Sequence, residues 1–461
     1  MSASAIMSAP ARQRKCPDEQ AGDADRGASS EVRSYRTTRP RGDVPAGPEP
    51  TITNPPPAAP GRTLRRRRLL LPRQRVETTL RHHEPDLVPW GEHSIDYNIY
   101  EMTLGRESWV HAKIKETRGL WDGRRDEIVE GYKRDVPELV RALGMDIVTV
   151  GMNPPAGHHP SALERVDEVT YRDGHGNIFR VSSATEQLMP YKINTEGYEP
   201  PTVGQLQEQI ERLESEPPAK PEDSCWEVMR HVVSEMKETH WINTCAGGLG
   251  FPAIGPTDEI RYMNMALLEP EVLSKWTELQ AKRLMCQLPW LAEEGVDSVM
   301  PCADLGSSTG LFGQPSLLAQ HVQPWWAEYN RRAHELGLKV LKHCCGRIWE
   351  ALPLICDAGF DGYEGIQASG GMDMAELKAK FGDRLTLWGG VWNEHLILGT
   401  PEDIDEDARY AIGHGAPGGG FIYGATHSLA MGTKPENLEE MQRARERYGT
   451  YPIRVPEVAA R

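Results

Sequence analysis

The stretch Leu336-Gly337-Leu338-Lys339-Val340-Leu341-Lys342-His343-Cys344-Cys345-Gly346 decides the fold, because a strand pattern in it ends on metal-binding side chains. Apolar residues alternate with other residues from Gly337 to Val340, and a helical pattern begins near Arg347. The order His-x-Cys-Gly brings an imidazole and a thiolate to the end of this strand, and both are ligands that suit Zn²⁺. Two ligands do not make a site, and free cysteines are often packed in cores. The surrounding sequence must therefore decide between these interpretations.

Similar short apolar runs recur along the chain, separated by longer amphipathic stretches. Strands that alternate with helices predict parallel βα units. A chain of 461 residues is long enough for a (β/α)8 TIM barrel with insertions. We therefore expect an α/β fold of this kind, with strands within Met145–Val150, Trp241–Cys245, Val296–Met300, Leu338–His343, Gly362–Ile366, Leu385–Gly389 and Gly420–Gly424.

Two segments depart from the barrel pattern. Val169–Val181 contains two alternating runs around a Gly-rich turn and predicts a β-hairpin inserted after the first barrel strand. Residues 1–70 are rich in Pro, Arg, Ser and Gly and lack apolar periodicity, which is typical of a disordered tail. This tail is basic, with 13 Lys and Arg against 7 Asp and Glu in residues 1–68. The barrel domain is expected to span residues 71–455.

Composition excludes several classes of function. The net charge is -15, and since the tail is basic, the body is still more acidic, which argues against nucleic-acid binding. The sequence contains no run of 18 or more apolar residues, so it predicts no membrane-spanning helix. The 8 cysteines show no compact disulfide framework, so we expect reduced thiols and a cytoplasmic protein.

Polar and metal-binding residues follow the predicted strands. In a TIM barrel the residues just past the carboxyl ends of the strands form the active site. Taken one at a time, these residues also have purely structural interpretations. Cys302 could pack in the core, Glu364 could pair with a lysine or cap a helix, and His427 could hydrogen-bond to the backbone of a loop. Cys245 precedes a Gly-rich turn that could approach a large ligand closely. Together the set predicts a metal site: Asn153, Cys245, Cys302, Asp304, His343, Cys345, Glu364, Gln367, Asn393 and His427.

Six segments, in order along the chain, match the pattern of one known superfamily: Glu84–Pro89, Asp304–Gly306, His343–Gly346, Phe381–Gly390, Gly418–Phe421 and Thr433–Leu438. From about Arg73 to Tyr451 the chain resembles the uroporphyrinogen decarboxylase superfamily, which includes zinc-dependent methyltransferases that work with corrinoids. The decarboxylases resemble one another in an early Arg-Gln-Ala-Gly-Arg segment, and Trp90–Asp96 stands in its place here, which argues against decarboxylation.

The methyltransferase resemblance implies particular site residues. Its His-x-Cys-Gly motif makes His343 and Cys345 zinc ligands. The third ligand is typically a Cys six residues before the Thr of a late Thr-x-x-x-Asn motif, and His427 occupies that position here. Imidazole can replace thiolate on zinc, so His427 is the expected third ligand, with Cys302, Glu364 and Cys344 in reserve.

The resemblance also suggests roles for the neighbouring residues. Asp304 would orient a ligand or accept a proton, and Glu364 would be a fourth ligand that substrate displaces. Cys245 and Asn153 are the candidates for contacts to the cofactor.

The expected activity is methyl transfer between a corrinoid (cobalamin) protein and a small methyl donor or thiol acceptor. The corrinoid is expected on a partner protein, because the chain has no Asp-x-His-x-x-Gly segment. One alternative is a uroporphyrinogen decarboxylase of porphyrin biosynthesis, which would need arginines at the barrel mouth. Another is a non-catalytic metal or tetrapyrrole binding protein. Arginines available for the decarboxylase alternative are Arg106, Arg118, Arg124 and Arg125.

Overall fold

Seven parallel strands form the central sheet of the protein, which we describe from a computed structural model covering residues 69–194, 201–251 and 268–455. The strand order is β1-β6-β7-β10-β11-β12-β13. Each strand coincides with one of the seven apolar runs, although β12 and β13 extend beyond the ends of theirs, to Val391 and Ala425. The expected α/β barrel fold is confirmed. The bounds are β1 Ile147–Thr149, β6 Trp241–Cys245, β7 Ser298–Met300, β10 Lys339–His343, β11 Gly362–Glu364, β12 Thr386–Val391 and β13 Phe421–Ala425.

The segment Pro89–Gly91 lies between β13 and β1 and fills the eighth position of the barrel. Trp90 forms a parallel bridge with Tyr423. The Gly91 N–H donates to the Tyr423 carbonyl at 3.1 Å, and the Tyr423 N–H donates to the Pro89 carbonyl at 2.8 Å. On the other side, the Asp146 N–H donates to the Trp90 carbonyl at 2.7 Å. This segment therefore links the first and last strands of the sheet.

A buried ionic network holds the closing segment in place. The Asp146 carboxylate accepts the Trp90 N–H at 2.9 Å and forms ion pairs with Arg75 and Arg445. Arg445 also donates to the Val88 carbonyl at 2.9 Å. Burial raises the pKa of Asp146 although both arginines oppose this, and burial lowers the pKa of Arg445. These shifts show that desolvation is costly here, so the network depends on every partner being present.

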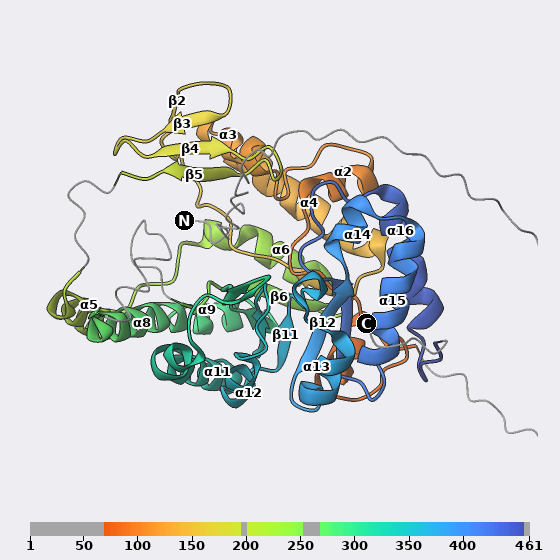
Figure 1. Ribbon diagram of the computed structural model, residues 1–461. Helices are drawn as coiled ribbons and strands as arrows, with labels where there is room; N and C mark the ends of the chain where they lie inside the picture. The colour runs from red at the N-terminus through yellow and green to blue at the C-terminus, as the bar shows by residue number, and fades with distance from the viewer. Residues whose placement is uncertain (1–68, 195–200, 252–267, 456–461) are drawn as a thin grey trace, which may run out of the picture. The chain divides into compact units, whose positions relative to one another are not determined.

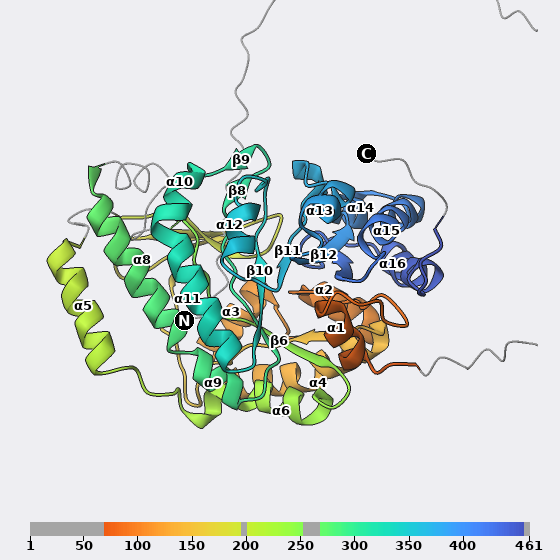
Figure 2. The same ribbon diagram turned by 90° about the horizontal axis from the view of Figure 1, so that it is seen from below.

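Helices cover the outside of the sheet (Figure 1). Several begin with standard caps; for example, Thr400 caps α15 through a capping box with Asp403, and Pro401 is the first helical residue. In Figures 1 and 2 α5 and α8 run side by side, and they bury their own apolar cluster. The bounds are α1 Pro72–Leu80, α2 Tyr97–Leu104, α3 Lys113–Trp121, α4 Arg125–Leu143, α5 Val203–Ser215, α6 Glu227–Met236, α8 Pro270–Met285, α9 Leu288–Glu293, α10 Pro315–Leu317, α11 Gln323–Glu335, α12 Leu352–Asp357, α13 Met374–Phe381, α14 Asn393–Leu398, α15 Pro401–Gly415 and α16 Pro435–Tyr448.

Alternate residues of each strand face the barrel interior. One inner cluster combines residues of six strands with two side chains of α1. Leu341 belongs to this cluster, whereas Val340 and Cys344 belong to the core outside the sheet. Strand alternation therefore places His343 on the inner face. The inner cluster consists of Val76, Leu80, Ile147, Trp241, Met300, Leu341, Trp388 and Ile422.

The insertion after β1 is larger than the expected hairpin. β3 (Thr170–Arg172) and β4 (Ile178–Val181) form that hairpin, and two further strands extend it to an antiparallel sheet in the order β2-β3-β4-β5. The added strands are β2 (Glu164–Arg165) and β5 (Leu188–Lys192). A small two-stranded sheet, β8 (Gly306–Ser307) and β9 (Gly310–Leu311), follows β7.

Two further expectations are the extent of the barrel domain and the absence of a membrane-spanning helix. The expected disordered tail lies almost wholly outside the described residues and stays a prediction, as does the 71–455 domain boundary. Among the described helices, none has the length and apolar character needed to cross a membrane.

We predict that Asp146→Ala lowers the free energy of unfolding by roughly 3–5 kcal/mol, because it leaves buried Arg445 without its partner. Urea unfolding monitored by circular dichroism measures this. The control is Glu439→Ala, which breaks an exposed pair with Arg443 and should change stability little. Equal stability of the two variants would contradict the role assigned to the network.

Candidate metal centre

Three strands of the sheet, β10, β11 and β13, deliver side chains to one end of the barrel. His343 ends β10, Glu364 ends β11 in register with it, and His427 follows β13 by two residues. Cys345 lies two residues after His343, so strand alternation returns its side chain to the same face. Because the carboxyl ends of parallel strands meet at one end of a barrel, these residues come together.

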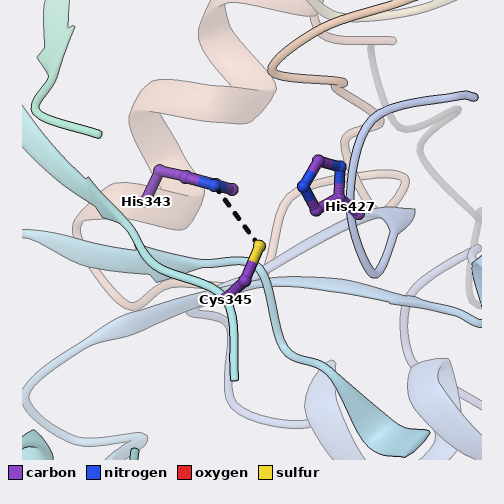
Figure 3. A group of neighbouring side chains, drawn as sticks. All are labelled: His343, Cys345 and His427. Carbon is purple, nitrogen blue, oxygen red and sulfur yellow. Dashed lines mark hydrogen bonds between the residues drawn. The ribbon is translucent and has the colours of Figure 1, made fainter. Parts of the chain in front are cut away.

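His343, Cys345 and His427 face one another (Figure 3). One potential ligand atom of each lies within 4.8 Å of those of the other two. His343 Nε2 is 3.5 Å from Cys345 Sγ, and the His343 and His427 ring centroids are 5.6 Å apart. Ligands at typical Zn–N and Zn–S lengths on one tetrahedral ion lie about 3.6 Å apart. The donor set and the spacing therefore fit a zinc ion.

Glu364 lies between two imidazoles. One carboxylate oxygen accepts from His343 Nδ1 and the other from His93 Nδ1, the latter at 3.1 Å. Burial would raise the pKa of Glu364, but the charges of His93 and His343 and their hydrogen bonds prevail and lower it. In neutral His343 the ionised carboxylate keeps the proton on Nδ1, and Nε2 is then free to bind a metal.

His427 is neutral at physiological pH. Burial, together with the charges of His93 and His343, lowers its pKa to about 3. Its Nδ1 accepts the Ser428 N–H at 2.7 Å and is 2.8 Å from Ser428 Oγ. Binding of a metal through Nε2 would require the proton to be on Nδ1, where the serine hydroxyl could accept it in place of the Ser428 N–H contact.

His93 is a site residue that the sequence did not reveal. It lies two residues beyond the closing segment Pro89–Gly91, and its ring centroid is 4.3 Å from that of His343 and 5.2 Å from that of His427. With His343 and Glu364 it forms a second group able to hold a metal. The only signal in the sequence was a count of seven predicted strands for an eight-stranded barrel, which requires one more segment between β13 and β1.

Asp304 lies beside the cluster. Its Oδ1 accepts the Cys345 N–H at 2.9 Å and is 3.8 Å from His343 Nε2. Burial and Asp304 raise the pKa of the Cys345 thiol, and the thiol itself hydrogen-bonds to Asp304. Asp304 therefore contacts both the backbone and the thiol of one candidate ligand.

The residues that alternate with the candidate ligands pack in the barrel wall. Cys344 is fully buried, and its sulfur accepts the Leu305 N–H at 3.2 Å. The buried Lys342 ammonium donates to the Ala303 and His343 carbonyls at 2.8 and 2.6 Å. Both therefore fix the turn before Gly306 against the end of β10.

Cys245 and Cys302 form a thiol pair on neighbouring strands. The Cys302 thiol donates to the Met300 carbonyl, with the sulfur 3.3 Å from the oxygen. The interaction of the two thiols lowers the pKa of Cys245 and raises that of Cys302 well above its usual range. Cys245 Sγ is also 3.9 Å from the His93 carbonyl. Neither thiol belongs to the metal-binding groups found among the described residues.

The predicted amide residues have other partners. The Asn153 side chain donates to the Ser224 carbonyl at 2.6 Å and accepts the Val228 N–H at 3.0 Å, so it anchors the start of α6. Asn393 donates to the Ser428 carbonyl at 3.0 Å and holds the loop that carries His427. Gln367 accepts the Gly346 N–H at 2.9 Å. We therefore leave Asn153 out of the proposed site.

The four arginines of the decarboxylase alternative are engaged elsewhere. Arg106 pairs with Asp135 at 2.7 Å and Arg124 with Glu127 at 2.7 Å. Arg118 donates to the Tyr171 hydroxyl at 2.7 Å. Arg125 donates to the Pro154 and Ser224 carbonyls at 2.8 and 2.6 Å. The contacts found for these arginines lie in α4, in β3 and in the loops after β1 and before α6, not in the cluster.

Comparison with known proteins agrees with the fold. The family model for uroporphyrinogen decarboxylase (URO-D) matches residues 186–448. A methyltransferase from Methanosarcina mazei is similar in structure, with a TM-score of 0.55, 15% sequence identity, and coverage of 82% of this chain and 99% of that one. At this identity the similarity shows the fold alone. A search of curated proteins finds no match.

Two further solved structures match more weakly. A structure described as native KDPGal has a TM-score of 0.24 at 14% identity, covering 53% of this chain and 86% of its own. A chitinase from Chromobacterium violaceum has a TM-score of 0.29 at 6% identity, covering 52% and 94%. At these scores neither match carries an argument.

We predict that limiting iodoacetamide alkylates Cys245 before Cys302 in the metal-free protein, because the thiolate is the nucleophile and Cys245 has the lowered pKa. Peptide mass spectrometry after short labelling at neutral pH measures the two rates. Faster labelling of Cys302 would contradict the assigned polarity of the pair. Buried Cys344, whose pKa burial raises to about 12, is the unreactive reference.

Proposed function

The chain belongs to the uroporphyrinogen decarboxylase family, and we propose that it is a zinc-dependent methyltransferase that moves a methyl group between a small substrate and a corrinoid protein. The observation that carries this proposal is the 3.5 Å approach of His343 Nε2 to Cys345 Sγ, with His427 facing both. A soft sulfur ligand and two imidazoles suit zinc. Three protein ligands leave one coordination position for substrate, as in catalytic zinc sites.

A zinc ion bound by these residues would lower the pKa of a substrate thiol and favour its thiolate at neutral pH. The protein's own residues prepare the site. Glu364 holds His343 with Nε2 free, and Asp304 holds Cys345 through its backbone N–H. Lys342 ties the end of β10 to the turn that carries Asp304. The ligands are thus positioned before substrate arrives.

The proposed reaction exchanges one bond for another. The substrate thiolate sulfur forms a bond to the methyl carbon while the carbon–cobalt bond of the corrinoid breaks, and its electron pair stays on cobalt. The corrinoid is proposed to arrive on a partner protein. In the opposite direction a methylated substrate would transfer its methyl group to the reduced corrinoid.

Decarboxylation is less well supported by the site. A polycarboxylate substrate needs basic groups around it, yet the four candidate arginines pair with carboxylates, a tyrosine or backbone carbonyls. A cysteine and two histidines of the candidate centre would also have no assigned task in cofactor-free decarboxylation.

The direct test mixes the zinc-loaded protein with methylcobalamin and a small thiol such as 2-aminoethanethiol. We expect demethylation of the corrinoid, followed by its absorbance, and the S-methyl product by mass spectrometry. Conversion of uroporphyrinogen without any methyl transfer would establish the decarboxylase instead. Zinc binding without either reaction would favour a non-catalytic metal-binding protein.

Metal content distinguishes the two ligand groups that share His343. We predict about one zinc per chain for the wild type, and loss of stoichiometric zinc in His343→Ala, Cys345→Ala and His427→Ala. His93→Ala should retain zinc, because His93 belongs only to the group with Glu364. Elemental analysis of dialysed proteins measures this. Zinc retained in His427→Ala but lost in His93→Ala would move the metal to the other group.

Glu364→Gln should keep the zinc but weaken its binding by about 10–100-fold, because the amide no longer fixes the His343 tautomer as an anion does. Competition with a chromogenic chelator measures the affinity. Glu376→Gln is the matched control, since Glu376 is half exposed and pairs with Lys380 on α13. An unchanged affinity in Glu364→Gln would show that the carboxylate does not support a metal ligand.

A further inference from the structure

Three of the four non-glycine residues with a left-handed backbone in the described part of the chain meet at one junction. His111, Lys113 and Glu186 have φ values of 51°, 52° and 53°. The first two lie at the start of α3, whereas Glu186 lies in the turn between β4 and β5 of the inserted sheet. The Ile114 N–H donates to the Glu186 carbonyl at 3.1 Å. Such backbone conformations persist where surrounding contacts impose them, and they gather at functional sites.

The junction holds Lys113 beside the carboxylate of Asp96. The Lys113 ammonium donates to Asp96 Oδ1, and the two side chains are only 12% and 9% exposed. The Tyr97 hydroxyl, next to Asp96 in the chain, donates to Glu186 Oε2 at 2.9 Å. Glu186 therefore contacts a neighbour of each member of the ion pair, and the inserted sheet braces the pair from outside.

The second oxygen of Asp96 reaches the loop that carries His427. Asp96 Oδ2 accepts the Met431 N–H at 3.0 Å. The Asp96 N–H donates to the Leu429 carbonyl at 2.9 Å, and the Leu429 N–H donates to the Ser94 carbonyl at 3.1 Å. One carboxylate thus connects the braced junction with the segment just beyond a candidate zinc ligand.

This connection bears on metal binding because His427 lies outside the strand ladder. β13 ends at Ala425, so no strand pairing fixes His427 itself. Asn393 holds one part of the loop through the Ser428 carbonyl, at 3.0 Å, and Asp96 holds the part that follows. A ligand on a loop keeps its place before the metal arrives only when contacts of this kind support it.

We propose that Asp96 is a positioning residue of the zinc centre, whose carboxylate holds the loop where His427 can share a metal with His343 and Cys345. Lys113 pairs with this carboxylate, and the inserted sheet keeps Lys113 in place. Asp96 touches neither metal nor substrate and acts through the loop alone. The inference rests on the proposed zinc-dependent function, since it matters only when His427 binds the metal.

Zinc affinity and the visible spectrum of the cobalt-substituted protein test this role. We expect Asp96→Ala to weaken zinc binding by about 10–100-fold, as loss of a supporting partner outside the ligand shell typically does. Competition with a chromogenic chelator measures the affinity. The cobalt spectrum should change as well, because it reports the geometry of the ligands, which a loss of fold stability alone leaves intact.

Asp96→Asn combined with Lys113→Met separates the loop contact from the ion pair. The amide oxygen can still accept the Met431 N–H, and methionine removes an ammonium that would otherwise stay buried without its partner. We expect this double variant to bind zinc within about threefold of the wild type and to restore the cobalt spectrum.

Asp361→Ala is the matched control. The Asp361 carboxylate also accepts one backbone N–H, from Val340 at 2.8 Å, and pairs with Lys339 at 2.6 Å. It lies just before β11, at the opposite end of the strand from the candidate zinc centre. This variant should lose stability but keep the zinc affinity and cobalt spectrum of the wild type.

The other outcomes separate this inference from the function on which it rests. Wild-type affinity and spectrum in Asp96→Ala, an equal loss in Asp361→Ala, or a double variant as weak as Asp96→Ala would each overturn the positioning role while zinc binding stands. If the wild type binds no zinc, or if His427→Ala binds it as tightly as the wild type, the proposed centre is wrong and the inference fails with it.

Discussion

The buried carboxylate of Asp146 is the interaction on which the site depends most. It accepts the Trp90 N–H and pairs with Arg75 of α1 and Arg445 of α16, so it holds the closing segment between β13 and β1. Without that segment the sheet would end in two open edges, whose unpaired backbone groups are costly. The same segment leads directly to Glu92 and His93. Barrel closure and assembly of the candidate metal centre therefore share one cause.

The carboxylate of Glu364 serves the chemistry in a comparable way. A carboxylate buried without partners would be protonated, but two imidazoles keep this one ionised. In return it orients both rings and leaves His343 Nε2 directed toward Cys345. We therefore propose that Glu364 supports a ligand, whereas the sequence suggested a fourth ligand that substrate displaces.

Much of the fold could be predicted because buried parallel strands are continuous apolar runs. All seven strands of the sheet were found in this way. Pro89–Gly91 was not predicted as the eighth segment, because three residues that begin with proline and end with glycine carry no strand pattern. The partners that hold this segment, such as Arg445, also lie far away in the sequence. The hairpin Val169–Val181 was visible from its Gly-rich turn, but β2 has only two residues, both exposed, and offered no apolar signal.

The site could be predicted in part for the same reason. His343, Cys345 and His427 follow recognisable strands, so a barrel brings them together without further knowledge. His93 follows the segment that carries no signal, and its place depended on the tertiary fold. Asn153 was selected by position alone, and the structure shows that its amide is used to anchor the start of α6.

Zinc K-edge X-ray absorption of the zinc-loaded protein tests the central claim most directly, because the inner shell distinguishes sulfur from nitrogen. We expect a four-coordinate ion with one sulfur at about 2.3 Å and two imidazole nitrogens at about 2.0–2.1 Å. Addition of 2-aminoethanethiol should raise the sulfur count to two. A shell of nitrogen and oxygen without sulfur would place the metal at His93, His343 and Glu364 and contradict the proposed centre.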